Sequence, residues 1–398
     1  MIDLKSSSKI NRAEKNKMNK KGKSKKKKFW IILGVVAILV LVGFFVVNSI
    51  FKKVSPDANL FNSLVKTLPG VENKLDGEDE GRINIALLGM RGKGVVGGGT
   101  LADTIIIASI RIIENETDKN AEPTYKVSMV SVPRDLYVTV PDTNDHQKIN
   151  AVYHYGEERG EGQGLELMKT ILRDISGQEI HYAMAVNFAG FEQIVDTLEG
   201  VEVTLEEEFI EPMQFHEEKV CDGANGGVFT VKSGRFDTKI DHRGKVVAQY
   251  PLCYNSTEEC GGVFKVPAGT SVLSGEQALC YVRARVTSSD FDRARRQQEV
   301  LKQLKKKALS IGIFSDFGKV TGIMGAVGDN LTLDMEVWEI ERFFDLYKKI
   351  GDPEMTQRVL ENSEEGLLYS HEGDARGYIL LPRGENFDKI REMFANII

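Results

Sequence analysis

Residues 279–297 read Leu-Cys-Tyr-Val-Arg-Ala-Arg-Val-Thr-Ser-Ser-Asp-Phe-Asp-Arg-Ala-Arg-Arg-Gln and decide how the chain is interpreted. Arg283 and Arg285 lie two residues apart, and side chains two apart in an extended segment share a face. We therefore expect a strand that presents both guanidiniums side by side. A helix beginning near Asp290 would place Asp290, Arg293 and Gln297 on one face.

This pattern would gather guanidiniums around one carboxylate and one amide. Arginine presents a rigid fork of donors that fits phosphate oxygens in pairs. The sequence therefore predicts a site for a multiply charged phosphate. The alternative is a basic, solvated helix face with surface ion pairs, but the arginine pair ahead of the helix favours the phosphate site.

An uncharged run from Phe29 to Phe51 precedes the region that carries these residues. As a helix it would be roughly 34 Å long, enough for a hydrocarbon core of about 30 Å. Residues 1–28 contain 12 Lys/Arg and two acids. We expect a basic cytoplasmic tail at 1–28, a transmembrane helix at 29–51 and an extracytoplasmic remainder. A cleaved signal peptide is the alternative, but no small-x-small cleavage site follows the run.

Charge is distributed unevenly along the chain. Beyond residue 53 there are 38 basic and 56 acidic residues, a net charge of −18 that the overall −6 conceals. Nucleic-acid backbones require a basic surface, so nucleic acid is excluded as a general partner. The lysine-rich tail suits contact with anionic membrane lipid.

Residues 52–80 are expected to form a stalk or linker, and residues 81–398 an extracytoplasmic domain. Strands and helices alternate along the domain, which predicts an α/β fold, a mixed central β-sheet sandwiched by helices. The expected strands are 83–88, 103–111, 125–132, 181–186, 201–205 and 377–382, and the expected helices include 164–175, 190–198 and 386–397.

A glycine-rich segment at about 206–269 interrupts this alternation and is interpreted as an insertion. It contains Cys221, Cys253 and Cys260. Outside the cytoplasm a disulfide is expected, either Cys253–Cys260 or Cys221 with one of those two. Cys280 lies between Leu279 and Tyr281, where it would serve as a small buried apolar residue.

Gly92, Gly94 and Gly97 formally satisfy G-x-G-x-x-G after the first strand. A dinucleotide site needs a helix directly after that loop. The next apolar run is strand-like instead, so NAD binding is excluded, and a P-loop is excluded because no Gly-Lys-Ser/Thr occurs in this loop. A glycine-rich loop near a phosphate, or a simple turn, remains.

Other candidate site residues lie at strand ends. Asp103 begins the second strand and could hold a hard cation that bridges phosphate oxygens, or it could cap a turn. Arg134 ends the third strand, where ligands bind in open α/β sheets, with Asp135 as a partner. Lys148 and Asn150 follow a loop and could add donors.

These residues belong to an ordered set of motifs that resembles the LytR-CpsA-Psr family, also called cell envelope-related transcriptional attenuators. The resemblance covers about residues 82–310, and its single-pass topology agrees. The motifs are Leu87-Leu-Gly, Asp103-Thr, Ser131-Val-Pro-Arg-Asp-Leu-Tyr, Lys148-Ile-Asn-Ala, Asn187-Phe-Ala-Gly-Phe, Val195-Asp-Thr-Leu-Glu-Gly-Val-Glu-Val, Leu273-Ser-Gly-Glu-Gln-Ala-Leu-Cys-Tyr-Val-Arg-Ala-Arg and Asp290 through Gln297.

The resemblance implies a membrane-anchored phosphotransferase with Mg²⁺ as cofactor. It would move a glycopolymer from an undecaprenyl-pyrophosphate carrier to a sugar hydroxyl of peptidoglycan. By the same resemblance, Asp103 would hold Mg²⁺ and Asp290 would orient arginines or assist the acceptor hydroxyl. The pyrophosphate would be bound by Arg134, Arg283, Arg285 and Arg293, with Gln297 in support. The carrier chain would need an apolar slot between sheet and helices.

Two positions depart from the family pattern. Arg91 stands where the family usually has a second metal-binding aspartate, and Leu101 where it usually has an arginine. Arg91 or Lys93 would have to compensate. The alternative function is a non-catalytic scaffold or regulator that binds carrier lipid or wall glycan. A DNA-binding attenuator conflicts with the acidic outer body.

Overall fold

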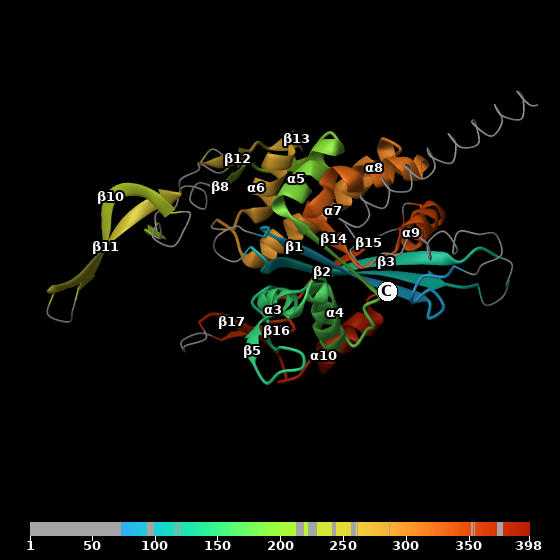
Figure 1. Cartoon of the computed structure of the whole chain (residues 1–398), viewed down its shortest axis with the longest axis horizontal. Helices are drawn as coiled ribbons and strands as arrows, with labels where there is room; N and C mark the ends of the chain where they lie inside the picture. The colour runs from blue at the N-terminus through green and yellow to red at the C-terminus, as the bar shows by residue number, and fades with distance from the viewer. Residues whose placement is uncertain are drawn as a thin grey trace, which may run out of the picture. The chain divides into compact units, whose positions relative to one another are not determined.

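The computed structural model describes residues 73–398 except 94–98, 116–117, 119–120, 212–218, 222–228, 241–243, 256–259, 261, 286, 352, 354 and 372–376. A six-stranded sheet with the order β14-β6-β1-β2-β3-β15 forms its centre (Figure 1). Its strands are β1 (Arg82–Met90), β2 (Ala102–Ile113), β3 (Thr124–Ser131), β6 (Tyr182–Asn187), β14 (Leu331–Leu333) and β15 (Met355–Val359). Strand β1 is parallel to β6 and antiparallel to β2, and β3 is antiparallel to β2 and parallel to β15, so the sheet is mixed as predicted.

Helices cover both faces of this sheet (Figure 1). One face carries α3 (Val152–Arg159), α4 (Gln163–Ser176) and α10 (Asp388–Asn396). The other carries α5 (Phe188–Thr197), α6 (Gly275–Arg283), α7 (Asp290–Ser310), α8 (Phe317–Val327) and α9 (Val337–Ile350). Strand β2 is consequently buried on both sides, and Ile105, Ile106 and Ile107 are at most 2% exposed. Runs of β-branched residues are typical of strands covered on both faces, and the predicted α/β sandwich is confirmed.

Helix α4 shows how the sequence produces these layers. Leu165, Met168, Leu172 and Ile175 recur at helical spacing and are buried beneath the sheet. Gly177 ends the helix with φ = 66°, a left-handed conformation that glycine adopts at low cost. The amphipathic stripe therefore fixes the face that packs, and the glycine fixes where the helix stops.

Smaller elements complete the domain. Short two-stranded sheets join β4 to β5, β7 to β13, and β16 to β17. Their bounds are β4 (Tyr137–Thr139), β5 (His146–Lys148), β7 (Val201–Leu205), β13 (Gly269–Leu273), β16 (Leu368–His371) and β17 (Ile379–Pro382). Single 3₁₀ turns occur at η1 (Ile149–Ala151), η4 (Ile313–Ser315) and η5 (Gly328–Asn330).

The end of the predicted stalk belongs to the domain. Leu75 is 2% exposed, and the backbone N–H of Asp76 donates to the Tyr182 hydroxyl at 2.8 Å. Glu78 forms an ion pair with Arg342 of α9. The predicted tail, membrane span and first part of the stalk, residues 1–72, lie outside the described residues. No helix among the described residues is long and apolar enough to cross a bilayer.

One predicted element is wrong. Arg283 ends helix α6, and Arg285 follows in a connection, so the two arginines do not share a strand face. Ser274 and Gln277 form a capping box that starts the helix. The strong start signal and the helix formers that follow it outweigh the extended appearance of Tyr-Val-Arg-Ala-Arg. Helix α7 begins at Asp290, as predicted.

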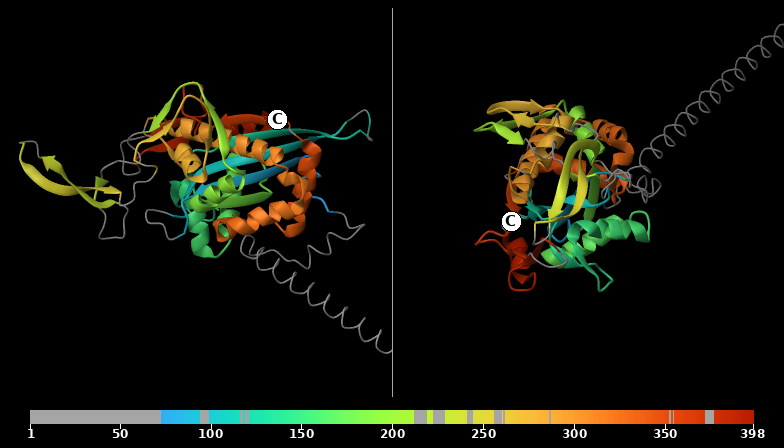
Figure 2. Two further views of the ribbon diagram at one scale, coloured as in Figure 1. Left: turned by 90° about the horizontal axis from the view of Figure 1, so that it is seen from above. Right: turned by 90° about the vertical axis from the view of Figure 1, so that its left-hand side faces the viewer.

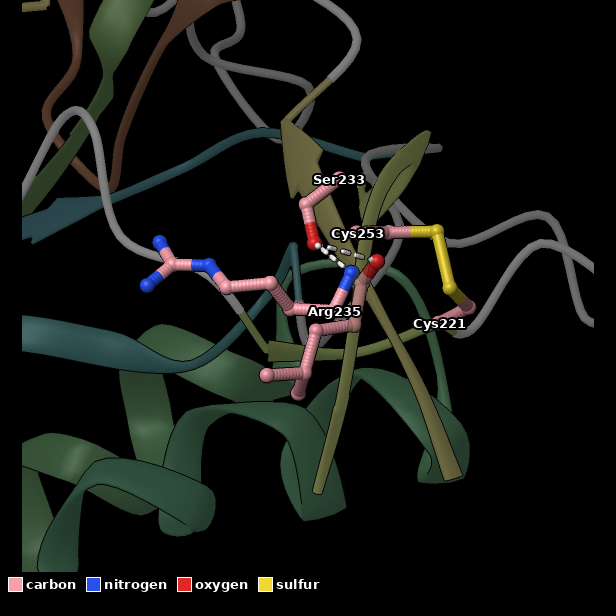
Figure 3. The surroundings of a disulfide bond; sticks show 5 residues. Cys221, Ser233, Arg235 and Cys253 are labelled. Atoms are coloured by element: carbon pink, nitrogen blue, oxygen red, sulfur yellow. Dashed lines mark hydrogen bonds between the residues drawn. A yellow bond between two sulfur atoms is a disulfide. The ribbon is translucent and has the colours of Figure 1, made fainter. Parts of the chain in front are cut away.

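The predicted insertion contains its own small sheet. Strands β9 (Lys219–Val220), β10 (Phe229–Ile240) and β11 (Val246–Asn255) pair only with one another within the described part of the chain (Figure 2). The disulfide Cys221–Cys253 links the base of this hairpin. Beside it, Ser233 Oγ donates to the Leu252 carbonyl and accepts from the Arg235 backbone N–H (Figure 3). The Cys221–Cys253 disulfide is one of the predicted alternatives.

The second disulfide joins Cys260 to Cys280 of α6, so Cys280 is buried as predicted but serves as a disulfide partner and not as a simple apolar residue. Strands β8 (Phe209–Glu211) and β12 (Phe264–Val266) pair at the base of the insertion. Phe264 and Val266 pack with α6 and α7 in a common core. The insertion is therefore connected to the helix that carries Arg283, a link between distant segments that sequence order did not reveal.

Candidate active site

The candidate site lies where several strand ends meet. Strands β1, β3, β6 and β15 run in the same direction, so their carboxyl ends share one edge of the sheet. Asp103, at the start of antiparallel β2, lies at that edge, and Arg134 follows β3 there. Ligands of open α/β sheets bind outside the carboxyl ends of strands, so the fold brings the predicted residues to the expected place.

Arg134 connects the carboxylates of this edge. Its Nη1 donates to Asp103 Oδ1 at 2.8 Å, and its Nε lies 3.5 Å from both Asp290 Oδ2 and Asp135 Oδ2. Burial opposes the charged guanidinium, but the three carboxylates outweigh it and raise the pKa of Arg134. Its buried Nε has no hydrogen bond within the described residues. The site therefore contains a fixed cation with a donor that a further acceptor could satisfy.

Asp290 forms ion pairs with two further arginines, Arg285 and Arg293. A capping box formed by Ser289 and Asp292 places Asp290 at the first position of α7. Asp290 Oδ1 lies 3.7 Å from Arg285 Nη1, and its Oδ2 lies 3.4 Å from Arg293 Nη2. Arg293 is only 8% exposed, and this burial, with the neighbouring Arg134 and Arg285, lowers its pKa to about 10 although Asp290 opposes the shift.

Three arginines converge on Asp290, and Arg134 also pairs with Asp103 and Asp135. Arg134, Arg285 and Arg293 all approach the single carboxylate of Asp290. A lowered pKa means that burial and like charges disfavour the charged form of Arg293. An anion with several oxygens would relieve that cost and engage the guanidiniums in pairs. Such an arrangement suits a phosphate or pyrophosphate, and the predicted phosphate site stays a prediction.

An apolar cavity of about 120 Å³ lies at Gln297, about one helical turn after Arg293 on α7. It lies between the sheet and helices α5, α6 and α7, and includes Ile106, Met184, Phe188, Phe191, Leu279, Val282 and Leu301. Arg283 and Gln297 line it as well. The Arg283 guanidinium lies 4.7 Å from the centre of the Phe188 ring, and Gln297 Nε2 donates to the Val282 carbonyl at 3.3 Å. An apolar chain in the cavity would thus meet these two polar side chains.

Sequence reasoning expected an apolar slot but did not identify its walls. The Asn187-Phe-Ala-Gly-Phe motif supplied a signal, because Phe188 and Phe191 project from α5 into the cavity lining. The remaining walls come from strands and helices far apart in the chain. No local pattern marks such a set.

Lys148 and Asn150 support the site indirectly, through Asp135 and the backbone of Arg134. Lys148 Nζ donates to Asp135 Oδ1 at 2.6 Å, and the Asn150 backbone N–H donates to the Arg134 carbonyl at 3.3 Å. Asp135, which is 8% exposed, contacts both Lys148 and Arg134 and so links the two side chains. These residues hold the turn that carries Arg134.

Arg296 is a positioning residue that sequence reasoning missed. Its guanidinium donates to the carbonyls of Tyr281 and Ala284 and to Ser288 Oγ. These contacts fasten the connection between α6 and α7, where Arg285 lies. The run Arg293-Ala-Arg-Arg contains no signal that separates Arg296 from its solvent-exposed neighbour Arg295.

The positions that depart from the family pattern lie near the same edge. Arg91 directly follows β1, whereas Lys93 Nζ forms an ion pair with Glu157 Oε2 of α3 at 2.9 Å. The glycine loop at 94–98 lies outside the described residues. Leu101 is half-buried, and its carbonyl accepts from the Asp103 backbone N–H at 3.0 Å.

The donor set for a metal is sparse. Within the described residues no group of three His, Cys, Asp or Glu side chains is placed to hold an ion. Asp103 and Asp290 both contact Arg134, so two carboxylates lie near one another. Mg²⁺ in phosphate-binding sites commonly takes one or two carboxylates and completes its shell with phosphate oxygens and water. Asp103 fits that role together with a bound phosphate.

The fold and site together define a class: an α/β domain with an arginine and aspartate cluster at the carboxyl ends of its parallel strands. The LytR_cpsA_psr family model matches residues 51–379. The chain belongs to the LytR_cpsA_psr family, and the predicted resemblance is confirmed.

Named relatives fall into two groups. The chain is 26% identical over 363 residues to the polyisoprenyl-teichoic acid–peptidoglycan teichoic acid transferase TagT of Bacillus subtilis, covering 89% of this chain and 92% of that protein. It is 26% identical to the transferase TagU of Bacillus mycoides, covering 86% of each. It is 28% identical over 258 residues to the regulatory protein MsrR of Staphylococcus aureus, covering 64% of this chain and 58% of that protein.

Solved structures confirm the fold. The crystal structure of protein gbs0355 from Streptococcus agalactiae has a TM-score of 0.51 and 19% identity, covering 81% of this chain and 92% of that one. A transcriptional regulator from Enterococcus faecalis has a TM-score of 0.50 and 17% identity, covering 81% and 89%. At these identities the likeness concerns the α/β architecture.

Proposed function

We propose that this protein is a phosphotransferase that moves a glycopolymer from a polyprenyl-pyrophosphate carrier to peptidoglycan during cell-wall assembly. The observation that carries the proposal is an apolar cavity whose lining includes Arg283 and Gln297, which lie two residues before Arg285 and about one helical turn after Arg293 of the arginine cluster. A polyprenyl pyrophosphate has the same division into a charged head and an apolar chain. The names of TagT and TagU support a wall-polymer transfer role.

The proposed reaction forms one phosphorus–oxygen bond and breaks another. The acceptor sugar hydroxyl attacks the phosphorus that carries the glycopolymer. The bond from that phosphorus to the bridging oxygen breaks, and polyprenyl monophosphate leaves. The hydroxyl proton passes to the Asp290 carboxylate or to water. The product is a phosphodiester between glycopolymer and peptidoglycan.

The residues act by positioning and charge neutralisation, which dominate catalysis of phosphoryl transfer. Arg134, Arg285 and Arg293 would bind the pyrophosphate oxygens around Asp290. Arg283 and Gln297 would contact the head group beside the apolar chain. Bound Mg²⁺, held by Asp103, would neutralise developing charge, with Arg91 placed at the same edge to add positive charge.

The proposed setting is the outer face of the membrane, with the cytoplasmic tail and the anchor at 29–51. Cys221–Cys253 and Cys260–Cys280 support this setting because disulfides persist in oxidising compartments. The uncharged run and its basic flank support a single-pass topology with the amino terminus inside.

The second candidate is a non-catalytic regulator or scaffold that binds the same carrier lipid or wall glycan. Arg91 and Leu101 favour it, because they replace an expected metal ligand and an expected phosphate contact. The name of the relative MsrR also agrees with a regulatory role. Both candidates require ligand binding, and only the transferase requires turnover.

Purified full-length protein in lipid nanodiscs, supplied with polyprenyl-pyrophosphate-linked glycopolymer, Mg²⁺ and a peptidoglycan oligomer, separates the candidates. The transferase releases polyprenyl monophosphate and yields glycopolymer linked to the oligomer, both detectable by mass spectrometry. If the protein binds the donor but forms no product, the transferase is rejected and the non-catalytic regulator or scaffold is supported.

A further inference from the structure

A second cavity, of about 330 Å³, lies at the same edge of the sheet beyond β15. It is lined by Arg295 of α7, the end of β15 and the loop from Glu361 to Leu367. Small-molecule sites in proteins commonly measure roughly 300–1,000 Å³. The cavity is therefore large enough for a ligand, and none of the functions described above uses it.

Strand register places this cavity beside the arginine cluster. Val359 of β15 pairs with Ser131 of β3, and the Leu360 backbone N–H donates to the Ser131 carbonyl at 3.0 Å. Glu361 therefore leaves the sheet next to the turn that carries Arg134. Backbones of neighbouring strands lie about 4.8 Å apart, so the two segments leave the sheet side by side.

The first turns of α7 lie between the two sites. Asp290 and Arg293 contact the cluster around Arg134. In contrast, Arg295 forms ion pairs with Asp292, at 2.9 Å, and with Glu361 at the cavity. One helix end thus lines both sites, so a molecule in the cavity would have one end near the phosphate.

The cavity is held in shape by its loop. The Leu368 backbone N–H donates to the Glu361 carbonyl at 3.1 Å, and Arg383 Nη2 donates to the Ser363 carbonyl at 3.1 Å. A Cβ atom on Gly366 would collide with the carbonyl oxygen of Glu361, so the turn requires glycine. A loop fixed in this way presents its polar groups in a defined arrangement.

The chemistry of the lining differs from that of the arginine cluster. Among the lining residues the charges balance, Arg295 and Arg358 against Glu361 and Glu365. Carboxylates accept hydrogen bonds and repel phosphates, whereas hydroxyl groups donate to them readily. Such a cavity favours an uncharged ligand that is rich in hydroxyl groups over an anionic polymer.

We propose that this cavity is the acceptor subsite, which binds the sugar backbone of peptidoglycan with a hydroxyl directed toward the arginine cluster. The inference rests on the proposed transferase function, because only a transferase needs an acceptor beside the pyrophosphate. It assigns the donor to the arginine cluster and apolar cavity, and the acceptor to the opposite side of α7.

Two variants test the subsite in full-length protein. Ser363→Phe fills the cavity and keeps the backbone carbonyl that Arg383 binds. The double variant Glu361→Gln/Glu365→Gln removes the two carboxylate charges of the cavity lining. Glu299→Gln, on α7 outside the cavity, is the matched control. We expect KM for a peptidoglycan oligomer to rise about tenfold or more, equivalent to the loss of one good hydrogen bond to a charged group. KM for the lipid donor should be unchanged.

A peptide-free peptidoglycan tetrasaccharide, titrated calorimetrically without donor, gives a readout independent of turnover. Both variants should weaken its binding about tenfold, while Glu299→Gln should not. Unchanged acceptor KM and binding in both variants, or a rise in donor KM instead, would overturn the subsite. If wild type makes no product but Ser363→Phe abolishes tetrasaccharide binding, the transferase fails and the glycan site stands.

Discussion

The arginine cluster and the β10–β11 hairpin differ in how the fold supports them. The cluster lies on elements buried in the domain, and each charged group contacts others from distant segments, as Arg134 does with Asp103 and Asp290. The hairpin pairs only with β9 among the described residues, and Phe236, Ile240 and Val247 are more than half exposed. A two-stranded hairpin without a packed face is marginal in water.

Precision and stability are therefore distributed separately in this domain. The cluster is fixed by packing and ion pairs, so changes there should affect chemistry strongly. The hairpin is fixed by its ladder and by Cys221–Cys253, so changes there should remain local.

Arg134→Ala should reduce kcat/KM for glycopolymer transfer by about 1,000-fold. The change removes the cation shared by three carboxylates, which is also the proposed donor to the pyrophosphate, and loss of one preorganised stabiliser of a transition state costs about 10²–10³-fold. Steady-state kinetics checks the loss. Arg173→Ala, which removes a half-exposed arginine of α4, is the control and should leave kcat/KM within twofold. Wild-type turnover in Arg134→Ala would remove the cluster from the mechanism.

Arg285→Ala and Arg283→Ala should each reduce transfer by about 100-fold and leave the fold intact. Arg285 is 43% exposed in its side chain, so its removal exposes little apolar surface. Circular dichroism and a melting curve check the fold, and product formation checks transfer. If neither variant changes turnover, the roles assigned to this pair are wrong.

The sequence predicted the parts of the site that depend on local pattern. β-branched runs marked β1, β2 and β3, and the residues around Ser289 marked the start of α7, which places Asp290 and Arg293. The Leu279–Arg285 stretch misled because its apolar and basic residues fit either a strand or a helix end. The capping box that begins at Ser274, five residues before Leu279, decides for the helix.

The remaining features depend on contacts between distant segments. Cys260 pairs with Cys280 because β12 packs against α6, and nothing in the cysteine spacing selects that pair. Glu361 reaches the site through the parallel pairing of β15 with β3, a connection of more than two hundred residues. Such positions follow from topology, which one sequence does not specify.

Removal of the Cys260–Cys280 disulfide should destabilise the domain with a moderate effect on activity. The bond closes a loop with a sequence separation of 20 residues, for which the chain-entropy model gives about 3 kcal/mol. The double variant Cys260→Ala/Cys280→Ala should lose about 3 kcal/mol of unfolding free energy, which lowers the denaturant concentration at the unfolding midpoint. Its kcat/KM should fall less than tenfold, because the capping box and core still hold α6. An unchanged unfolding midpoint would show that the link to the insertion does not support the site.

Removal of the Cys221–Cys253 disulfide should have the smallest effect on the domain. Cys221→Ala/Cys253→Ala frees the base of the hairpin, while the six-stranded sheet keeps all its contacts. Amide hydrogen exchange in β10 and β11 should accelerate, because the freed hairpin opens locally. The unfolding midpoint of the domain and kcat/KM should stay within error and within twofold of wild type. The Cys260→Ala/Cys280→Ala variant is the matched control, since it also removes one disulfide. If both pairs lower the domain midpoint equally, the hairpin unfolds together with the sheet, and the separation between a supported site and a locally stabilised insertion does not hold.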